Sequence, residues 1–127
     1  TNMNKNEIAH NITGTYEVSR TIAVNYKIDY VEGQIITLDK AESWTKAGMF
    51  TPETFGEYEY TFIPENKVAG HEVDYDNEEE CYELGCEDCD QECEVLLPAG
   101  TRFVITRVAT DLDFEEMGYY EINIKFI

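Results

Sequence analysis

The fold of this chain is decided by the stretch Glu92-Cys93-Glu94-Val95-Leu96-Leu97-Pro98-Ala99-Gly100-Thr101-Arg102-Phe103. Its Val-Leu-Leu run is typical of a short buried strand, and the Pro-Ala-Gly that follows supplies the dihedral angles of a tight turn. Residues 102–108 then predict a second strand. Since residues i and i+2 share one face of a strand, we expect Glu92 and Glu94 to point the same way at the lip of the first strand.

Glu92 and Glu94 form an unfavourable pair in purely structural terms. Two carboxylates this close repel each other unless a cation or a substrate hydroxyl compensates their charge. A fold rarely needs such a pair for stability, whereas a reaction often does. These two glutamates are therefore the first candidate functional residues, and the alternative is a pair of solvent-facing acids on an edge strand.

Most of the remaining sequence also predicts strands, because aromatic and β-branched residues dominate it or alternate with polar ones. The predicted strands are 15–29, 34–38, 58–63 and 119–127. Helical signal is confined to residues 7–12 and 39–48, with Gly48 as a stop, and residues 111–118 predict a connecting turn. We expect one compact domain over residues 1–127, of the α+β class and predominantly β.

The charge of the chain is concentrated in one segment. The formal net charge is -18, and residues 72–94 hold twelve Asp or Glu and no Lys or Arg. This balance disfavours nucleic acid and anionic membranes as partners, because both require cationic side chains. We expect the acidic loop at about 72–93 either to attract a basic protein surface or to be a solvated, flexible loop. No run approaches the ~20 apolar residues of a membrane span, and the start does not resemble a signal peptide.

Four cysteines fall inside the acidic loop and none lies elsewhere. Cys81, Cys86, Cys89 and Cys93 follow the spacing C-x4-C-x2-C-x3-C. Four thiolates within thirteen residues can close a tetrahedral zinc site, although the paired spacing of standard zinc modules is absent. Two disulfides in an oxidising compartment and four free thiols are the alternatives. Either cross-link would order the loop that leads into Glu92.

The decisive stretch also resembles a known family. Glu-x-Glu followed by Val-Leu-Leu-Pro-x-Gly-Thr-x-Phe resembles the third conserved block of the mono-ADP-ribosyltransferases, which transfer ADP-ribose from NAD to protein side chains. Ser43-Trp44-Thr45 resembles the Ser-Thr-Ser block of the family, and residues 16–21 resemble its first strand, which carries an NAD-binding arginine. The resemblance covers roughly residues 15–126. It implies an ADP-ribosyltransferase-like fold of packed antiparallel and mixed sheets with few short helices.

The resemblance implies a role for each glutamate. Glu94 would hydrogen-bond the 2′-hydroxyl of the nicotinamide ribose and stabilise an oxocarbenium-like ribose, which is a preorganised electrostatic contribution to catalysis. Glu92 would bind the guanidinium of an acceptor arginine and help to remove its proton. Ser43 would hydrogen-bond Glu94 from behind, and Thr45 would share its strand face. An ordinary strand or helix-cap pair is the alternative for Ser43 and Thr45.

The resemblance also implies which residues bind NAD. Arg20 would bind the diphosphate through charge-assisted hydrogen bonds, and the alternative is an edge-strand arginine paired with a carboxylate. Phe50, Phe55 and Tyr58 flank the loop after the Ser-Trp-Thr block, and an aromatic ring there could stack on nicotinamide, although aromatic residues are more often part of a core. Arg102 and Arg107 follow the turn and are expected to face outward.

These expectations define a small NAD-dependent mono-ADP-ribosyltransferase that modifies arginine, of the kind found in bacteriophages and as toxin domains. It would act in the cytoplasm, which is the host cytoplasm if a phage encodes it, or as a secreted toxin domain. The alternative is a binding module that has lost catalysis and holds a basic protein with its acidic loop. A third interpretation is a structural part of a larger phage or toxin protein, since the chain starts at Thr1 rather than Met.

Overall fold

The computed structural model describes residues 4–46, 56–73 and 94–127. These residues form two helices, α1 (Lys5–Ala9) and α3 (Asp111–Met117). They also form nine strands, which are β1 (Gly14–Tyr16), β2 (Val18–Val24), β3 (Ile35–Thr37), β4 (Glu42–Lys46), β5 (Tyr58–Pro64), β6 (Val68–Glu72), β7 (Glu94–Leu97), β8 (Arg102–Val108) and β9 (Tyr120–Phe126). Among the described residues, neither helix is long and apolar enough to cross a membrane. The predicted predominantly β, α+β class is confirmed.

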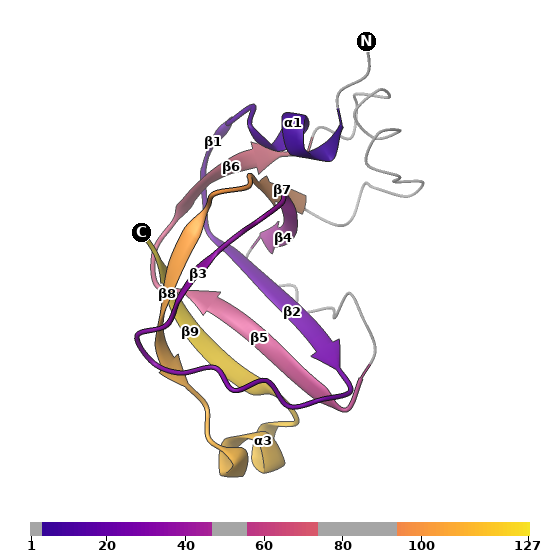
Figure 1. The fold of residues 1–127 in the computed structure, drawn as a ribbon, viewed down its shortest axis with the longest axis vertical. Coiled ribbons are helices and arrows are strands. Elements are labelled where there is room, and N and C mark those ends of the chain that lie inside the picture. The colour runs from indigo at the N-terminus through magenta and orange to yellow at the C-terminus, as the bar shows by residue number, and fades with distance from the viewer. Residues whose placement is uncertain (1–3, 47–55, 74–93) are drawn as a thin grey trace.

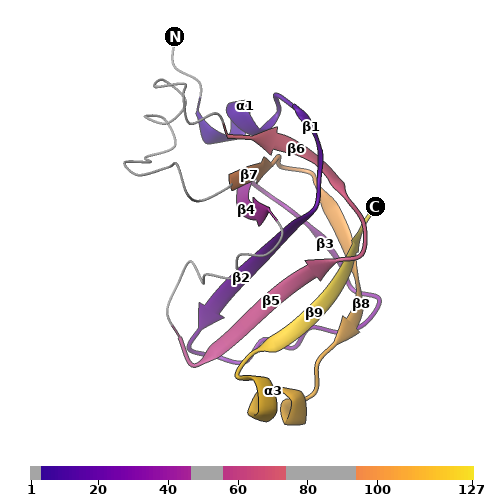
Figure 2. The same ribbon diagram turned by 180° about the vertical axis from the view of Figure 1, so that it is seen from behind.

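The nine strands hydrogen-bond in the order β1-β6-β7-β4-β2-β5-β9-β8-β3. Every described pair is antiparallel except β5 with β9. Figures 1 and 2 show two parts of this sheet, with the short strands β1, β6, β7 and β4 at the end near α1. The longer strands β2, β5, β9 and β8 run obliquely toward α3. Strand β2 joins the two parts, because it pairs with β4 at its start and with β5 over the rest of its length.

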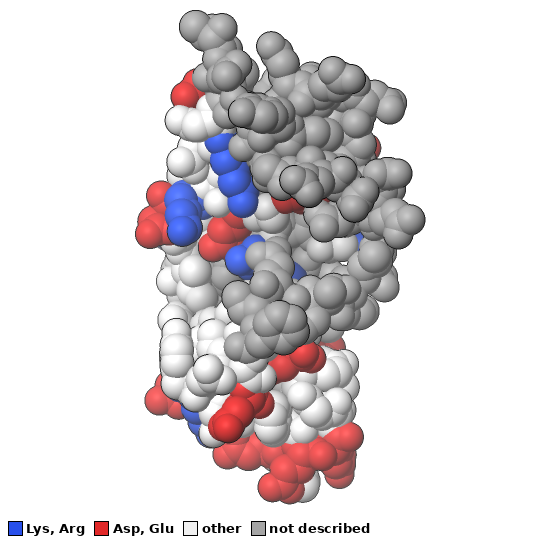
Figure 3. Space-filling model, turned by 90° about the vertical axis from the view of Figure 1, so that its right-hand side faces the viewer, with Lys and Arg blue, Asp and Glu red and all other residues white. Residues whose placement is uncertain are grey.

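Helix α3 closes the opposite end of the molecule from α1. Thr110 and Asp113 form a capping box at its start, and Gly118 ends it with φ 84°, a conformation that favours glycine. Neither its first nor its last turn contains a basic residue, and both cap partners face solvent. Figure 3 shows Asp and Glu atoms gathered at this lower end, whereas most of the Lys and Arg atoms on the same face lie higher.

The decisive stretch forms the predicted strand, turn and strand. All four residues of β7 are buried. In the turn, the Thr101 amide donates to the Pro98 carbonyl oxygen at 3.2 Å, and Gly100 has φ 91°, which a residue with a side chain rarely adopts. The turn also exchanges main-chain hydrogen bonds with Leu38, at 2.8 and 2.9 Å. These bonds tie the β7–β8 connection to the chain just before β4.

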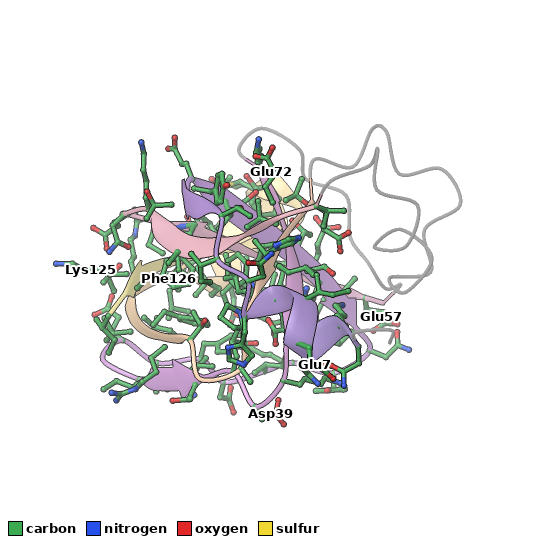
Figure 4. All side chains as sticks on the ribbon, turned by 90° about the horizontal axis from the view of Figure 1, so that it is seen from above. Glu7, Asp39, Glu57, Glu72, Lys125 and Phe126 are labelled. Atoms are coloured by element: carbon green, nitrogen blue, oxygen red, sulfur yellow. The ribbon has the colours of Figure 1, made fainter. Side chains whose placement is uncertain are left out.

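The main hydrophobic core lies on one face of the sheet. Alternation along the strands places the core side chains on this face, and on β9 it places polar side chains on the other. Figure 4 shows this on β9, where Phe126 points inward and Lys125 points away. Trp44 is 1% exposed and packs against three phenylalanine rings with centroids 5.6 to 6.2 Å away. Trp44 is therefore a central residue of this core.

A smaller apolar cluster lies on the other face of the short strands, beneath α1. It contains Ile8, Ala9, Ala41, Val73 and Leu96. The Asn4 side chain caps α1 by accepting from the Glu7 amide at 2.9 Å, and the Asn6 side chain accepts from the Ala41 amide at 2.6 Å. Because Leu96 belongs to this cluster, α1 covers the face of β7 that also carries Glu94.

Three local predictions are wrong. The strand expected at residues 15–29 is two strands, β1 and β2, of which the second ends at Val24. Residues 39–48 were expected to be helical, but Glu42–Lys46 is strand β4, because it pairs with β7 on one side and with β2 on the other. Residues 111–118 were expected to be a connecting turn, but they hold α3. Strand β6 was not predicted. A helical turn expected at residues 7–12 exists, but it spans Lys5–Ala9.

Candidate functional site

Three side chains with oxygen atoms form a row across β2, β4 and β7. Thr45 on the central strand is the register partner of Ser19 on β2 and of Glu94 on β7. Directly opposed residues of antiparallel strands point to the same face, so two hydroxyl groups and one carboxylate share this face. The row lies on the face that carries Leu96, next to the apolar cluster beneath α1.

Glu94 is held in place by its main chain and is largely removed from water. Glu94 is only 9% exposed, and its main-chain carbonyl oxygen accepts a hydrogen bond from the Val73 amide at 3.1 Å. A carboxylate with little access to water interacts more strongly with charge that develops nearby, because water screens it less. The position predicted from the Glu-x-Glu motif is therefore electrostatically suited to stabilise a cationic sugar.

Ser43 lies on the same face but not directly opposite Glu94. Its register partner on β7 is Leu96, whereas Thr45 faces Glu94. Ser43 thus occupies a diagonal position, and such positions are about 7–8 Å apart between Cα atoms. The register makes Thr45 the nearer of the two hydroxyl residues to the carboxylate.

Arg20 lies at the fork where β2 leaves β4. Its Nη1 donates to the carbonyl oxygen of Ser43 at 2.5 Å, and its Nε lies 3.7 Å from Glu42 Oε1. The Arg20 side chain is 19% exposed. Because neighbours along a strand alternate, Arg20 leaves β2 on the face opposite to Ser19. Its guanidinium group therefore bridges the two strands from the other side of the row.

The charges around the fork are arranged in pairs. Glu42 Oε1 also accepts from Trp44 Nε1 at 3.3 Å, so one carboxylate oxygen serves both the indole and Arg20. Lys46 forms an ion pair with Glu72, and its Nζ lies 5.6 Å from the centre of the Tyr16 ring. Arg102 and Arg107 are exposed on β8, as expected, and belong to a different part of the sheet.

Sequence reasoning missed Ser19. Its side chain is 5% exposed, and its Oγ is the only buried side-chain nitrogen or oxygen of the described residues that has no hydrogen-bond partner. The signal was present in the sequence, because Ser19 precedes Arg20 and alternation places neighbours on opposite faces. A prediction based on Arg20 alone therefore points to the face of β2 opposite to Ser19.

The remaining predicted site residues lie outside the described residues. These are Glu92, Phe50, Phe55, Cys81, Cys86, Cys89 and Cys93. Within residues 4–46, 56–73 and 94–127 there is no group of three His, Cys, Asp or Glu side chains that could hold a metal ion. The zinc prediction concerns only the four cysteines and stays a prediction.

A cavity lies at the far end of the sheet, near α3. This cavity of about 530 Å³ is lined by the loop of residues 27–31, by Tyr60 and Tyr120, and by the start of α3. The Tyr120 hydroxyl donates to Asp111 Oδ1 at 2.8 Å, and Lys27 Nζ donates to the same oxygen at 2.8 Å. Burial and the Asp111 carboxylate raise the pKa of Tyr120 to about 12. The polar groups here are bonded to one another.

Comparison with known proteins places the fold. No model of a protein family matches the sequence, and no curated protein matches it. The type III effector XopAI of Xanthomonas axonopodis pv. citri matches with a TM-score of 0.52 and 19% identity, over 89% of this chain and 45% of that one. The ADP-ribosyltransferase HopU1 of Pseudomonas syringae pv. tomato matches with a TM-score of 0.52 and 14% identity, over 90% and 46% of the two chains.

These similarities establish an ADP-ribosyltransferase-like fold, which confirms the fold that the sequence resemblance implied. The chain spans slightly less than half the length of each of the two solved structures. The similarity extends to the fold alone, and a reaction has to be inferred from the side chains of the site.

Proposed function

We propose that this chain is the catalytic portion of an NAD-dependent mono-ADP-ribosyltransferase that modifies arginine on a protein target. The observation that carries the proposal is the pairing of Glu94 with Thr45 in an ADP-ribosyltransferase-like fold. A largely buried carboxylate stands beside hydroxyl groups of two neighbouring strands. This arrangement suits a ligand that presents sugar hydroxyls and develops positive charge.

In the proposed reaction, the bond between C1′ of the nicotinamide ribose and the ring nitrogen breaks, and its electron pair stays on nicotinamide. The Glu94 carboxylate stabilises the oxocarbenium-like ribose that results. A guanidinium nitrogen of the target arginine then forms a bond to C1′. The proton lost from this nitrogen goes to the carboxylate of Glu92. The products are ADP-ribosylated arginine, nicotinamide and one proton.

Other residues would bind NAD and orient the site. We assign binding of the diphosphate to Arg20, whose guanidinium group lies at the β2–β4 fork. The backbone around Ser43 and Thr45 would also bind NAD. Ser43 would support Glu94 from its diagonal position on the same face. Stacking on nicotinamide is assigned to Phe50 or Phe55.

The test measures release of nicotinamide from NAD, with and without the arginine analogue agmatine. The wild type should release nicotinamide, and agmatine should increase the rate. Glu94→Gln keeps the size of the side chain but removes its charge, and should lower kcat by at least about 100-fold. Glu92→Gln should abolish the stimulation by agmatine, because its amide cannot accept the guanidinium proton.

A matched variant controls for loss of one negative charge from a strand. Glu121→Gln changes a half-buried glutamate on β9, which pairs with Thr61 far from β7. It should leave the rate unchanged. The transferase proposal is wrong for this chain if the folded wild type releases no nicotinamide, or if Glu121→Gln and Glu94→Gln lower the rate equally.

One observation favours a second candidate function, a binding module without catalysis. Arg20 leaves β2 on the face opposite to Glu94 and is already paired with Glu42 and bonded to Ser43. A diphosphate would have to reach its guanidinium group through the β2–β4 fork and compete with both partners. Such a module would hold a basic protein with the acidic segment 72–93, as would a structural part of a larger phage or toxin protein. A folded wild type that binds a basic protein but neither binds nor hydrolyses NAD would support this function.

The setting of the proposed reaction follows from the acceptor. A protein target with an accessible arginine and a basic surface suits the net charge of -18. We place the reaction in the cytoplasm of a host cell, with a secreted toxin domain as the alternative. A structural zinc ion held by the four cysteines would order the segment that presents Glu92 to its target.

A further inference from the structure

Ser19 has a hydroxyl group that is buried but forms no hydrogen bond within the described residues. The residue is 5% exposed, and Oγ has no hydrogen-bond partner in the part of the chain that the structure describes. Buried polar groups are nearly always hydrogen-bonded, and one that is not costs about 1–3 kcal/mol. Such an exception calls for an explanation, and a ligand that supplies the missing partner is one.

The neighbours of Ser19 indicate where this ligand would lie. Ser19 and Glu94 flank Thr45, each as its direct register partner. Opposed Cα atoms of antiparallel strands are about 4.5–5.5 Å apart, so the Cα atoms of Ser19 and Glu94 are separated by about 10 Å. The glutamate side chain extends over part of this distance. A polar group above Thr45 is therefore within reach of both side chains.

Thr21 shows that this strand can satisfy a hydroxyl group on the same face. It lies two residues beyond Ser19, and its Oγ1 is 3.1 Å from Thr61 Oγ1 on β5, where both residues are buried. The Thr21 hydroxyl, where β2 pairs with β5, is thus hydrogen-bonded within the protein. The Ser19 hydroxyl, which has no such bond, lies where β2 pairs with β4, in line with Glu94.

We propose that Ser19 is a substrate-binding residue that hydrogen-bonds a hydroxyl group of the nicotinamide ribose of NAD, beside Glu94. This inference rests on the proposed transferase function. A ribose diol suits the row, because one hydroxyl group donates to the carboxylate while its neighbour accepts from Ser19 Oγ. Ser19 forms no covalent bond. It holds the sugar while the bond from C1′ to nicotinamide breaks.

Ser19→Ala is the central variant, because it should weaken ligand binding without lowering the stability of the ligand-free protein. Removal of an unbonded buried hydroxyl should leave the melting temperature of the ligand-free protein unchanged or raise it. The same change should weaken binding of NAD and ADP-ribose by about 3- to 10-fold, the value of one hydrogen bond. Binding of ADP, which lacks the second ribose, should be unchanged. Calorimetric titration with the three ligands measures these affinities.

Thr21→Val is the matched control on the same strand and face. It leaves the Thr61 hydroxyl buried without its partner, so the melting temperature should fall, whereas affinity for NAD and ADP-ribose should not change. If Ser19 had a purely structural role, Ser19→Ala would behave like Thr21→Val, with a lower melting temperature and unchanged affinity for NAD and ADP-ribose. A lower melting temperature in Ser19→Ala, or unchanged affinity for ADP-ribose, overturns the proposal.

The outcomes also separate this inference from the proposed function. If the wild type releases nicotinamide and Ser19→Ala binds ADP-ribose as tightly as the wild type, only the role of Ser19 is wrong. If the folded wild type binds neither NAD nor ADP-ribose, the transferase proposal fails, and the assignment of Ser19 fails with it.

Discussion

The guanidinium group of Arg20 donates a hydrogen bond to the main-chain carbonyl oxygen of Ser43, across the fork at which β2 separates from β4. A side chain on one strand thus satisfies a main-chain group of the next strand at the point where the ladder between them ends. The same guanidinium group is our candidate for the NAD diphosphate. Two variants separate its structural role from its binding role.

Arg20→Ala should lower the free energy of unfolding by about 1.5–3 kcal/mol, because the hydrogen bond from a charged group to Ser43 is lost. Urea denaturation measures this change. Arg102→Ala, which removes an exposed arginine from β8, should stay within about 0.5 kcal/mol of the wild type. Equal stability of the two variants would show that Arg20 does not hold the fork together.

Glu42→Gln should strengthen NAD binding, because it removes the carboxylate that lies 3.7 Å from Arg20 Nε. We expect the KM for NAD to fall about 3-fold, in keeping with the small energy of a partly exposed ion pair. Steady-state kinetics of nicotinamide release measures the change. Glu121→Gln again controls for net charge. An unchanged or higher KM in Glu42→Gln would argue against Arg20 as the residue that binds the diphosphate.

Ile122→Ala should lower the free energy of unfolding by about 2–5 kcal/mol, because Ile122 is fully buried at the centre of the main core. The fluorescence of Trp44 reports the transition, since it is the only tryptophan of the chain and is 1% exposed. Leu112→Ala removes a side chain that is 63% exposed on α3, and should change stability by less than about 0.5 kcal/mol.

Asp111 should make the protein less stable in acid. The hydrogen bond from Lys27, followed by that from the Tyr120 hydroxyl, lowers the pKa of Asp111 below its usual 3.8. A carboxyl with a lower pKa in the folded state stabilises this state above the unfolded pKa, and the contribution is lost as the pH falls through the folded pKa. Below about pH 3.8, unfolding of the wild type should therefore become easier.

The check is thermal unfolding as a function of pH in the wild type and in Asp111→Asn. The variant should lose stability less steeply below the usual aspartate pKa, because it has no carboxylate to protonate. Asp39→Asn, at an exposed position outside the strands, controls for the change in net charge. Parallel acid profiles of Asp111→Asn and the wild type would contradict the prediction.

The predictable parts of the fold are the strands in which the order of apolar and polar residues itself indicates which side chains are buried. The apolar run of β7 with its Pro-Ala-Gly turn, and the alternating residues of β5 and β9, carry a local signal of strand structure. The Glu-x-Glu motif likewise placed Glu94 on a buried strand. These elements needed no knowledge of their neighbours, because the pattern of each already fits a buried or half-buried strand.

The errors arose where neighbours decide the structure. Ser43-Trp44-Thr45 is too short to show an alternating pattern by itself, and it becomes a strand because β7 and β2 lie on either side of it. Strand β6 has Gly70 at its centre, where an added Cβ would lie 2.8 Å from Val95 Cγ1, so only tertiary packing explains that residue. Helix α3 was a different error, because its capping box and Gly118 were visible in the sequence.

The position of β9 in the sheet has a consequence for synthesis of the protein. Tyr120–Phe126 lies between β5 and β8, parallel to the first and antiparallel to the second. A ribosome delivers both partners of this strand before the strand itself. Until it emerges from the exit tunnel, the apolar faces of β5 and β8 have nothing to join them. The sheet therefore closes only once β9 has emerged, and chaperones that shield apolar strands are expected to bind the nascent chain before that.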